Sequence, residues 1–448
     1  MLKAEPAGGL PRICTPTGGS TMPRVRKDIN ALTDTELDDY IHALGILRER
    51  SDANEDDPSG YAFQAALHNG SAGPCEHGSD LFLPWHRAHL HYFEKLLQEA
   101  DPPRTQNVTV PYWDWMSEQT PEKFPLAFKK PGLKAPRSSA PATLPPNTRQ
   151  IVTMETDQKE FAGYPDGDLL GDAGRLESGP HDTMHGFYIG GLMANPSTAA
   201  EDPLYFSFHC FIDLMWAEWQ HRNGSPPLTS PDHVLRGFTS QPRNKVSDFT
   251  DTVGLDYEYE YNDQLKEAFA VPVPPPPPFP PSLLATQPLT PLDANTDLVT
   301  ELRDKEVARL GFSVPETRGQ RLLVRLDELK VPNTGTYMLR GFLHPSDVPF
   351  QPDDSEFSRR FGAGYVTLWR AHPHGHHDHD GPPVAHHPVS RTARFDVTST
   401  LDSLGADGAD LAFTLQFIPA PSPTGMPPHP VPPLDEVELK DVRMEVYS

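Results

Sequence analysis

The chain has 448 residues, of which 37% are hydrophobic and 22% charged, and its formal net charge is -24. This length exceeds what one hydrophobic core usually organises, so the sequence predicts two domains. The negative charge opposes binding to a phosphate backbone, so no nucleic-acid partner is expected. No apolar run approaches the roughly 20 residues needed to cross a bilayer, so no membrane partner is expected either.

The N-terminal residues and the number of cysteines indicate the cellular compartment of the protein. Residues 1–22 are rich in Gly, Pro and Thr and are predicted to form a flexible lead. They contain neither the apolar stretch of a secretory signal nor a twin-arginine pair. Three cysteines, Cys14, Cys75 and Cys210, are too few for a disulfide framework. These features predict a cytoplasmic protein.

The first predicted helix follows residue 33. Thr33 is its expected N-cap, and Glu36, three residues on, completes a capping box. The apolar residues from Leu37 to Leu47 then recur on one helical stripe. This helix opens a predicted domain over residues 23–270. Within it, residues 117–150 and 155–176 are rich in Pro, Gly and Asp and are expected to be irregular.

Five histidines lie within 24 residues: His68, His77, His86, His89 and His91. The segment after Pro84 has the apolar spacing of a helix, which puts His86 in its first turn and His77 in the Gly-rich loop before it. Imidazole suits copper, zinc and iron, so three of these side chains could hold one metal ion. Any one of them alone is more simply explained as a hydrogen-bonded core residue.

A second cluster makes a metal site the better explanation. His181 and His185 are four residues apart, on one face of a predicted helix. His209 lies in a strongly apolar helix, where a polar side chain needs a partner. Two histidine trios without carboxylate ligands argue against a di-iron bundle. A single zinc in the HExxH manner is unfavourable, because it would leave the first cluster unexplained.

Together these runs resemble the coupled dinuclear copper proteins: tyrosinases, catechol oxidases and molluscan haemocyanins. The family run C-x-H-G-x-x-x-F-x-x-W-H-R stands at Cys75 to Arg87. The run H-x-x-x-H stands at His181 to His185, and D-P-x-F-x-x-H-H-x-N-x-D-R-x-W at Asp202 to Trp216. The run PYWDW is intact at Pro111 to Trp115.

The resemblance implies two copper ions, each held by three histidines. The implied ligands are His68, His77 and His86 for one ion, and His181, His185 and His209 for the other. It also implies a thioether bond between Cys75 and His77, and supporting positions for Phe82 and Asp213. Three of the departures from the last motif, none of them at a ligand, are Phe208 in place of His, Phe211 in place of Asn and Leu214 in place of Arg.

The implied activity is ortho-hydroxylation of monophenols and oxidation of o-diphenols to o-quinones with O2. A phenol has a pKa of about 10 and must lose its proton at neutral pH, so a base is needed. In relatives that role falls to a water held by two side chains, which match Glu177 and Asp182 here. Two carboxylates so close should raise one pKa. The simpler readings are a solvated loop residue for Glu177 and a first-turn helix acid for Asp182.

Three functions therefore compete. The resemblance favours a tyrosinase that acts on small phenols and catechols. A catechol oxidase without hydroxylase activity has the same ligand motifs. A haemocyanin-like oxygen carrier is the third candidate, although one unit of this length without tandem repeats speaks against it. The oligomeric state is left open.

The end of the first domain is expected near the run DYEYEY. Tyr259 and Tyr261 match the closing Y-x-Y of the family, and Arg26 matches the arginine that stacks on a tyrosine there. Residues 271–294 contain VPVPPPPPFPP and are predicted to be a semi-rigid proline-rich linker.

Residues 295–448 change to short alternating runs at regular spacing, which predicts an all-β sandwich or barrel. The predicted fold is thus α+β and multidomain, with a mainly α-helical copper domain around a four-helix-bundle core, followed by the β-domain. That second domain resembles the C-terminal domain of molluscan haemocyanins and is expected to act as a lid over the site. Its run of seven histidines between residues 372 and 387 is either a loose metal-capturing segment or a polar insertion.

Overall fold

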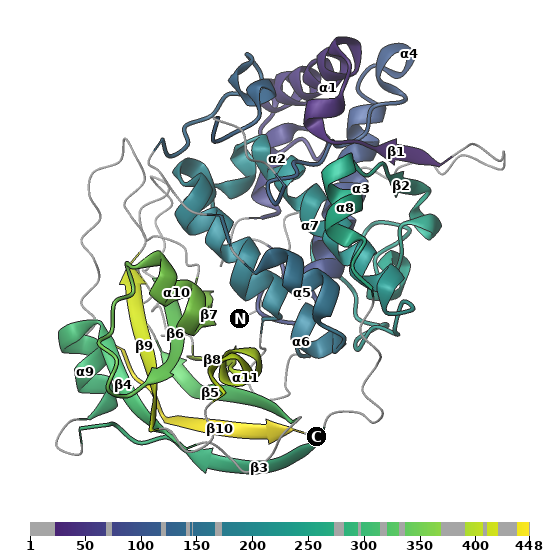
Figure 1. Cartoon of the computed structure of the whole chain (residues 1–448). Helices are drawn as coiled ribbons and strands as arrows, with labels where there is room; N and C mark the ends of the chain where they lie inside the picture. The colour runs from purple at the N-terminus through teal and green to yellow at the C-terminus, as the bar shows by residue number, and fades with distance from the viewer. Residues whose placement is uncertain are drawn as a thin grey trace, which may run out of the picture. The chain divides into compact units, whose positions relative to one another are not determined.

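The computed structural model describes most of the chain (Figure 1). The described residues are 23–68, 74–117, 122–139, 144–145, 147–165, 173–272, 282–293, 297–313, 320–330, 337–368, 390–405, 410–419 and 437–447. The predicted flexible lead, the seven-histidine run and most of the polyproline run lie outside them. Contacts divide the chain into two compact units near residue 274. The first unit is mainly helical and the second is built of antiparallel sheets, so the predicted fold class is confirmed.

The helical unit is organised around a few long helices and many short ones. Its α-helices are α1 (Asp34–Ala53), α2 (Tyr61–Ala66), α3 (Phe82–Gln98), α4 (Pro102–Thr105), α5 (Thr148–Met154), α6 (Gln158–Ala162), α7 (Leu204–Arg222) and α8 (Asp263–Phe269). Two π-helical segments, η3 (Glu177–His181) and η4 (Met184–Ile189), follow one another before α7. None of the helices in the described part of the chain is long and apolar enough to span a bilayer.

The local signals in the sequence have clear structural outcomes. Thr33 caps α1, and its reciprocal bonds with Glu36 form the predicted capping box. Helix α3 starts at Phe82, which puts Pro84 in the first turn, where no intrahelical N–H is needed. The expectation of irregular structure was wrong for α6, which lies within residues 155–176, and for the first three residues of α5, which begins at Thr148.

Helices α3 and α7 pack against one another at the centre of the unit. Almost every residue of both helices is buried, so neither presents a polar face to solvent. The large aromatic side chains of α7, from Tyr205 to Trp219, explain this, because an apolar surface on all sides suits only a central helix.

A buried network of charged side chains joins the first and last strands of the unit to its central helices. Strand β1 (Arg24–Arg26) pairs in parallel with β2 (Tyr257–Tyr259). From β1, the fully buried Arg26 donates to Glu94 of α3 at 2.8 Å and to Asp213 of α7 at 3.4 Å. Burial alone would raise the pKa of Asp213, but the neighbouring Arg87 and Arg26 lower it below its ordinary value.

This network corrects the expectation about the closing tyrosines. The guanidinium of Arg26 lies 3.7 Å from the ring centre of Tyr257 and donates to the hydroxyl of Tyr259. Tyr261 instead donates to Glu218 at 2.9 Å. The Y-x-Y pair is therefore Tyr257 and Tyr259, because β2 ends at Tyr259 and only its residues face Arg26.

The second unit consists of two four-stranded antiparallel sheets. One has the strand order β3 (Leu283–Pro288), β10 (Asp441–Tyr447), β5 (Arg321–Lys330), β8 (Ser390–Asp396). The other has the order β4 (Val307–Phe312), β9 (Leu411–Pro419), β6 (Tyr337–Pro345), β7 (Gly362–Leu368). Apolar residues from both sheets form one buried cluster, which is the core of a sandwich.

Some predicted boundaries in this unit need correction. Leu283–Pro288 was assigned to the linker, but it forms strand β3 and pairs with β10. The alternating run from Ala393 to Leu401 predicts a strand, but that strand (β8) ends at Asp396, and helix α11 (Thr398–Leu404) follows. Helices α9 (Leu298–Lys305) and α10 (Ser355–Phe361) were not expected. The role of this domain as a lid stays a prediction.

Candidate metal centre

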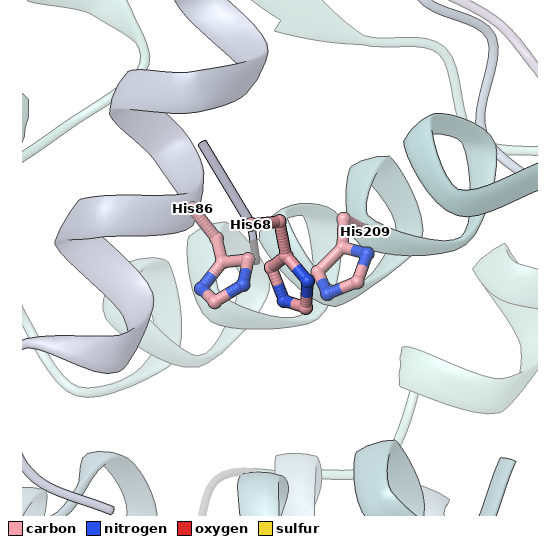
Figure 2. A group of neighbouring side chains, drawn as sticks. All are labelled: His68, His86 and His209. Atoms are coloured by element: carbon pink, nitrogen blue, oxygen red, sulfur yellow. The ribbon is translucent and has the colours of Figure 1, made fainter. Parts of the chain in front are cut away.

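Five helical elements and one loop bring the six predicted histidines into one place. His68 follows α2, His86 lies on α3, His181 and His185 lie on η3 and η4, and His209 lies on α7. His77 reaches the same place from the loop before α3. Figure 2 shows the rings of His86, His68 and His209 side by side, with His86 coming from α3 and His209 from α7.

Each of the six imidazoles is held through Nδ1, here called its outer nitrogen, by a hydrogen-bond partner. The Nδ1 atoms of four rings lie 2.8 to 3.0 Å from backbone carbonyl oxygens: His68 with Pro196, His86 with Phe82, His185 with Met193, and His209 with Tyr205. A carbonyl can only accept, so these Nδ1 atoms carry the hydrogen. The Nε2 atoms of these four rings are thereby left with a lone pair, the form that binds a metal.

The second trio is a tight cluster. The donor nitrogens of His181, His185 and His209 lie within 4.8 Å of one another. Glu177–His181 and Met184–Ile189 wind as π-helix, which is the wider turn often found at functional sites. The prediction that His181 and His185 share a helix face is therefore right, although the helix is not a regular α-helix.

The first trio is more open and adjoins the second. The ring centres of His68, His77 and His86 lie 5.0 to 5.4 Å apart. The possible metal-ligand atoms of His68, Cys75 and His77 lie within 4.8 Å of one another, and so do those of His68, His86 and His209. The rings of His86 and His209 are stacked with centres 4.6 Å apart, so the two trios share a boundary.

Burial sets the charge of these rings. It lowers the pKa of His68, His86, His181 and His209 well below the usual range, and that of His185 to about 3. These five rings are therefore neutral at pH 7. For His77 burial also lowers the pKa, but hydrogen bonds with Cys75 and Glu177 outweigh it and raise the pKa to about 10.

The donor set fits copper. The Nε2 atom of His86 is buried and has no hydrogen-bond partner among the described residues. Nε2 of His181 and Nε2 of His209 face one another at 3.1 Å, although both rings are neutral and use Nδ1 elsewhere. Two lone pairs so close call for a cation between them. Neutral imidazoles without carboxylate ligands suit copper better than magnesium or calcium.

The two predicted carboxylates do not lie together on one open face. Glu177 is buried and lies 3.0 Å from Nδ1 of His77, and it also accepts from the backbone of Gly78. Asp182 is buried as well and lies 2.8 Å from Nδ1 of His181. Each carboxylate thus orients one ring, one in each trio. A role for the pair in holding a water stays a prediction.

Aromatic rings surround the imidazoles. Phe82 packs against His86 and His181, with ring centres 4.6 and 4.7 Å apart. It therefore lies between the two trios instead of beside the first alone. Phe208, which replaces a histidine of the motif, packs against His185 at 4.9 Å. Asp213 supports α7 through the Arg26 network, and the bonds described for it involve none of the six histidines.

Sequence reasoning missed Tyr205, which stands where the family motif has Phe. Its ring centre lies 4.0 Å from that of His209 and 4.8 Å from that of His68, so it touches both trios. Nε2 of His89 donates to the carbonyl of Gln64 at 3.1 Å, which leaves Nδ1 to accept from the Tyr205 hydroxyl at 3.3 Å. Burial lowers the pKa of His89 to about 3, so this ring is neutral.

Comparison with known proteins gives the same picture of the helical unit. The family described as "Common central domain of tyrosinase" matches residues 58–145 and 129–222. A tyrosinase of Hahella sp. is 27% identical over 257 residues, which are 45% of this chain and 54% of that protein. A chloroplastic polyphenol oxidase of Vitis vinifera is 28% identical over 302 residues, 55% of this chain and 48% of that one. The chain spans about half the length of these two relatives.

Other matches cover a larger share of the matched protein. A Streptomyces antibioticus tyrosinase is 26% identical over 279 residues, 53% of this chain and 98% of that enzyme. Among solved structures, a latent aurone synthase (polyphenol oxidase) from natural source superimposes with a TM-score of 0.69 at 18% identity. That match covers 98% of this chain and 92% of the other, so the likeness of fold includes the β-domain.

Replacing Tyr205 with Phe should lower the stability of the protein without changing its metal content. The ring packing is kept, but Nδ1 of the buried His89 loses its donor, which costs about 1 to 3 kcal/mol. The measurement is chemical denaturation of Tyr205→Phe, both alone and in a His89→Phe background. In that background the loss should be much smaller, and an equal loss in both would contradict the hydrogen bond.

Proposed function

Because the chain belongs to the tyrosinase and polyphenol oxidase family, a family of dinuclear copper proteins, we propose that it is a tyrosinase. It hydroxylates small monophenols and oxidises o-diphenols to o-quinones with O2. The observation that carries this proposal is the pair of adjoining histidine trios, buried and neutral except for His77, with outer nitrogens already engaged.

The metal ligands follow from the same observation. The proposed ligands are His68, His77 and His86 for one copper ion, and His181, His185 and His209 for the other. Two copper ions held there supply the redox chemistry with O2. All else that the site does is done by the chain: it fixes ring orientation, lines the metals with apolar side chains and supplies carboxylates.

The boundary between the trios is where a phenol would be oxidised, since ligand rings of both trios meet there. Phe82 packs against rings of both trios and Phe208 against rings of the second trio, and both buried side chains keep water from the ligands.

The carboxylates distinguish the tyrosinase proposal from a catechol oxidase. A monophenol arrives protonated and must give up a proton before it binds a metal, so it depends on a base more than a catechol does. Asp182 is the better candidate, because it lies beside His181 in the tight second trio. A catechol oxidase is the alternative if this carboxylate only orients the ring. An oxygen carrier remains the third candidate, and quinone formation from catechol separates it from both.

The copper-loaded protein should contain two copper ions per chain. His86→Ala or His209→Ala should reduce that content to about one and abolish catechol oxidation, because each trio then keeps only two neutral imidazoles. Metal analysis by mass spectrometry measures both, with the surface variant His42→Ala as control. Active protein that contains a single zinc would contradict the assignment.

Asp182→Asn should lower the ratio of monophenol to diphenol turnover by about a hundredfold, the low side of what a general base contributes. The amide oxygen still accepts the hydrogen bond from Nδ1 of His181, so ring orientation and copper content are kept. Steady-state rates with a monophenol and its catechol measure the ratio. The exposed Asp263→Asn serves as control, and an unchanged ratio would show that the carboxylate only positions His181.

Cys75 and His77 should become cross-linked after copper loading. Their donor atoms lie in one group with His68, and the thiol is already hydrogen-bonded to the imidazole. The thiol hydrogen and one ring hydrogen are lost to O2 at the copper site as a sulfur–carbon bond forms. Peptide mass mapping should show the loss of two hydrogen atoms from this peptide. If Cys75 of active, denatured protein is fully alkylated, the cross-link does not exist.

A further inference from the structure

A side chain that contacts both histidine trios is itself a phenol. The ring centre of Tyr205 lies 4.0 Å from that of His209 and 4.8 Å from that of His68, so Tyr205 touches one proposed ligand of each copper ion. The Tyr205 side chain is buried, so its ring is fixed against the trios by packing. Phenols are what the proposed enzyme oxidises, so Tyr205 is an oxidisable group held permanently beside the copper centre.

The hydroxyl of Tyr205 has a base within reach. Nδ1 of His89 lies 3.3 Å from the hydroxyl oxygen, and Nε2 of the same ring donates to the carbonyl of Gln64 at 3.1 Å. A carbonyl only accepts, so the hydrogen of His89 lies on Nε2 and the lone pair of Nδ1 faces Tyr205. His89 is buried too, so the group beside the hydroxyl is an imidazole and not bulk water.

Two other buried tyrosines have a weaker acceptor. Tyr61 donates its hydroxyl to the carbonyl of Ala200 at 3.0 Å, and Tyr112 donates to the carbonyl of Glu260 at 2.7 Å. A backbone carbonyl accepts a hydrogen bond but is too weak a base to take the proton. Of these three tyrosines, only Tyr205 both contacts the trios and faces a base.

We propose that Tyr205 is an internal electron donor to the copper pair, with His89 as its proton acceptor, a role that rests on the proposed tyrosinase function. Tyr205 gives one electron to the oxidised copper pair, and its hydroxyl proton moves to Nδ1 of His89. The products are a neutral tyrosyl radical and an imidazolium, which keeps its hydrogen on Nε2 and its bond to Gln64. Return of the electron reverses both transfers.

The step protects the ligands when no phenol occupies the site. An oxidised copper pair without a substrate can take an electron from the imidazoles that hold it, and Tyr205 supplies that electron from a side chain that is not a ligand. The buried imidazolium is unfavourable, so the radical state is short-lived and the electron returns. Tyr205 is thus a temporary store for one oxidising equivalent.

The test uses the full-length, copper-loaded protein with its copper reduced, freed of reductant, mixed with O2 in the absence of phenols and frozen rapidly. Electron paramagnetic resonance of protein labelled with ring-deuterated tyrosine should show a tyrosyl radical, which deuteration narrows. Tyr205→Phe should abolish this signal, and His89→Phe should lower it, because the hydroxyl then has no base. Tyr61→Phe is the matched control and should keep the signal.

A merely structural role for Tyr205 would not move the radical signal. If the unmodified protein binds two copper ions and oxidises catechol but gives no tyrosyl signal, or if Tyr205→Phe keeps the full signal, Tyr205 is not the donor. The proposed function would stand in either case. A chain that neither binds copper nor oxidises catechol would overturn both proposals.

Peptide mass mapping tests the protective role directly. After long exposure to O2 without phenols, Tyr205→Phe should carry more oxidised His68 and His209 than Tyr61→Phe does. Copper content measured at the start shows that both variants hold the site. Equal oxidation of these histidines in the two variants would contradict the protection.

Discussion

The candidate metal centre depends on what the outer nitrogens of its imidazoles do. A histidine binds a metal through one nitrogen only when the other has a partner that fixes the tautomer and the plane of the ring. Four of these partners are backbone carbonyls, and two are the carboxylates of Glu177 and Asp182. The geometry of the site is thus set largely by the course of the backbone and not by side chains that could rotate away.

The second requirement is that the helices which carry the rings stay in register. Helices α3 and α7 are tied by the buried carboxylate of Asp213, which accepts from Arg87 at 2.5 Å and also from Arg26 and the hydroxyls of Tyr257 and Tyr259. A buried carboxylate is costly unless its lone pairs are used, and here two cations and two hydroxyls use them. The network holds the helices without occupying space at the metal site.

The sequence predicts which histidines gather at this centre, because metal binding depends on the type and spacing of the residues. Motif spacing was enough to name the six histidines, and the capping box was enough to start α1 at the right place. The hydrogen-bond partners of the rings could not be predicted from the sequence. Every residue has a backbone carbonyl, so nothing singles out that of Met193 or Pro196. Tyr205 was visible as a departure from a motif, but its meaning depends on His89, which only the packing of α3 against α7 reveals.

In the β-domain the misses have a different cause. Alternating apolar residues predict strands well. A short segment next to a proline-rich run, however, is easily taken as part of that linker. Leu283–Pro288 pairs with β10, more than 150 residues away in the chain, and no local signal announces such a partner. The reverse holds at Thr398–Leu404, where a β-branched run that favours a strand folds as helix α11.

The pairing of β1 with β2 has a consequence for synthesis. Arg26 and Tyr259 are 233 residues apart, yet they share one buried network. The helical unit therefore cannot close until nearly all of it has left the ribosome, and α3 must wait with its apolar surface uncovered. Such non-local closure is slow and exposes intermediates to aggregation.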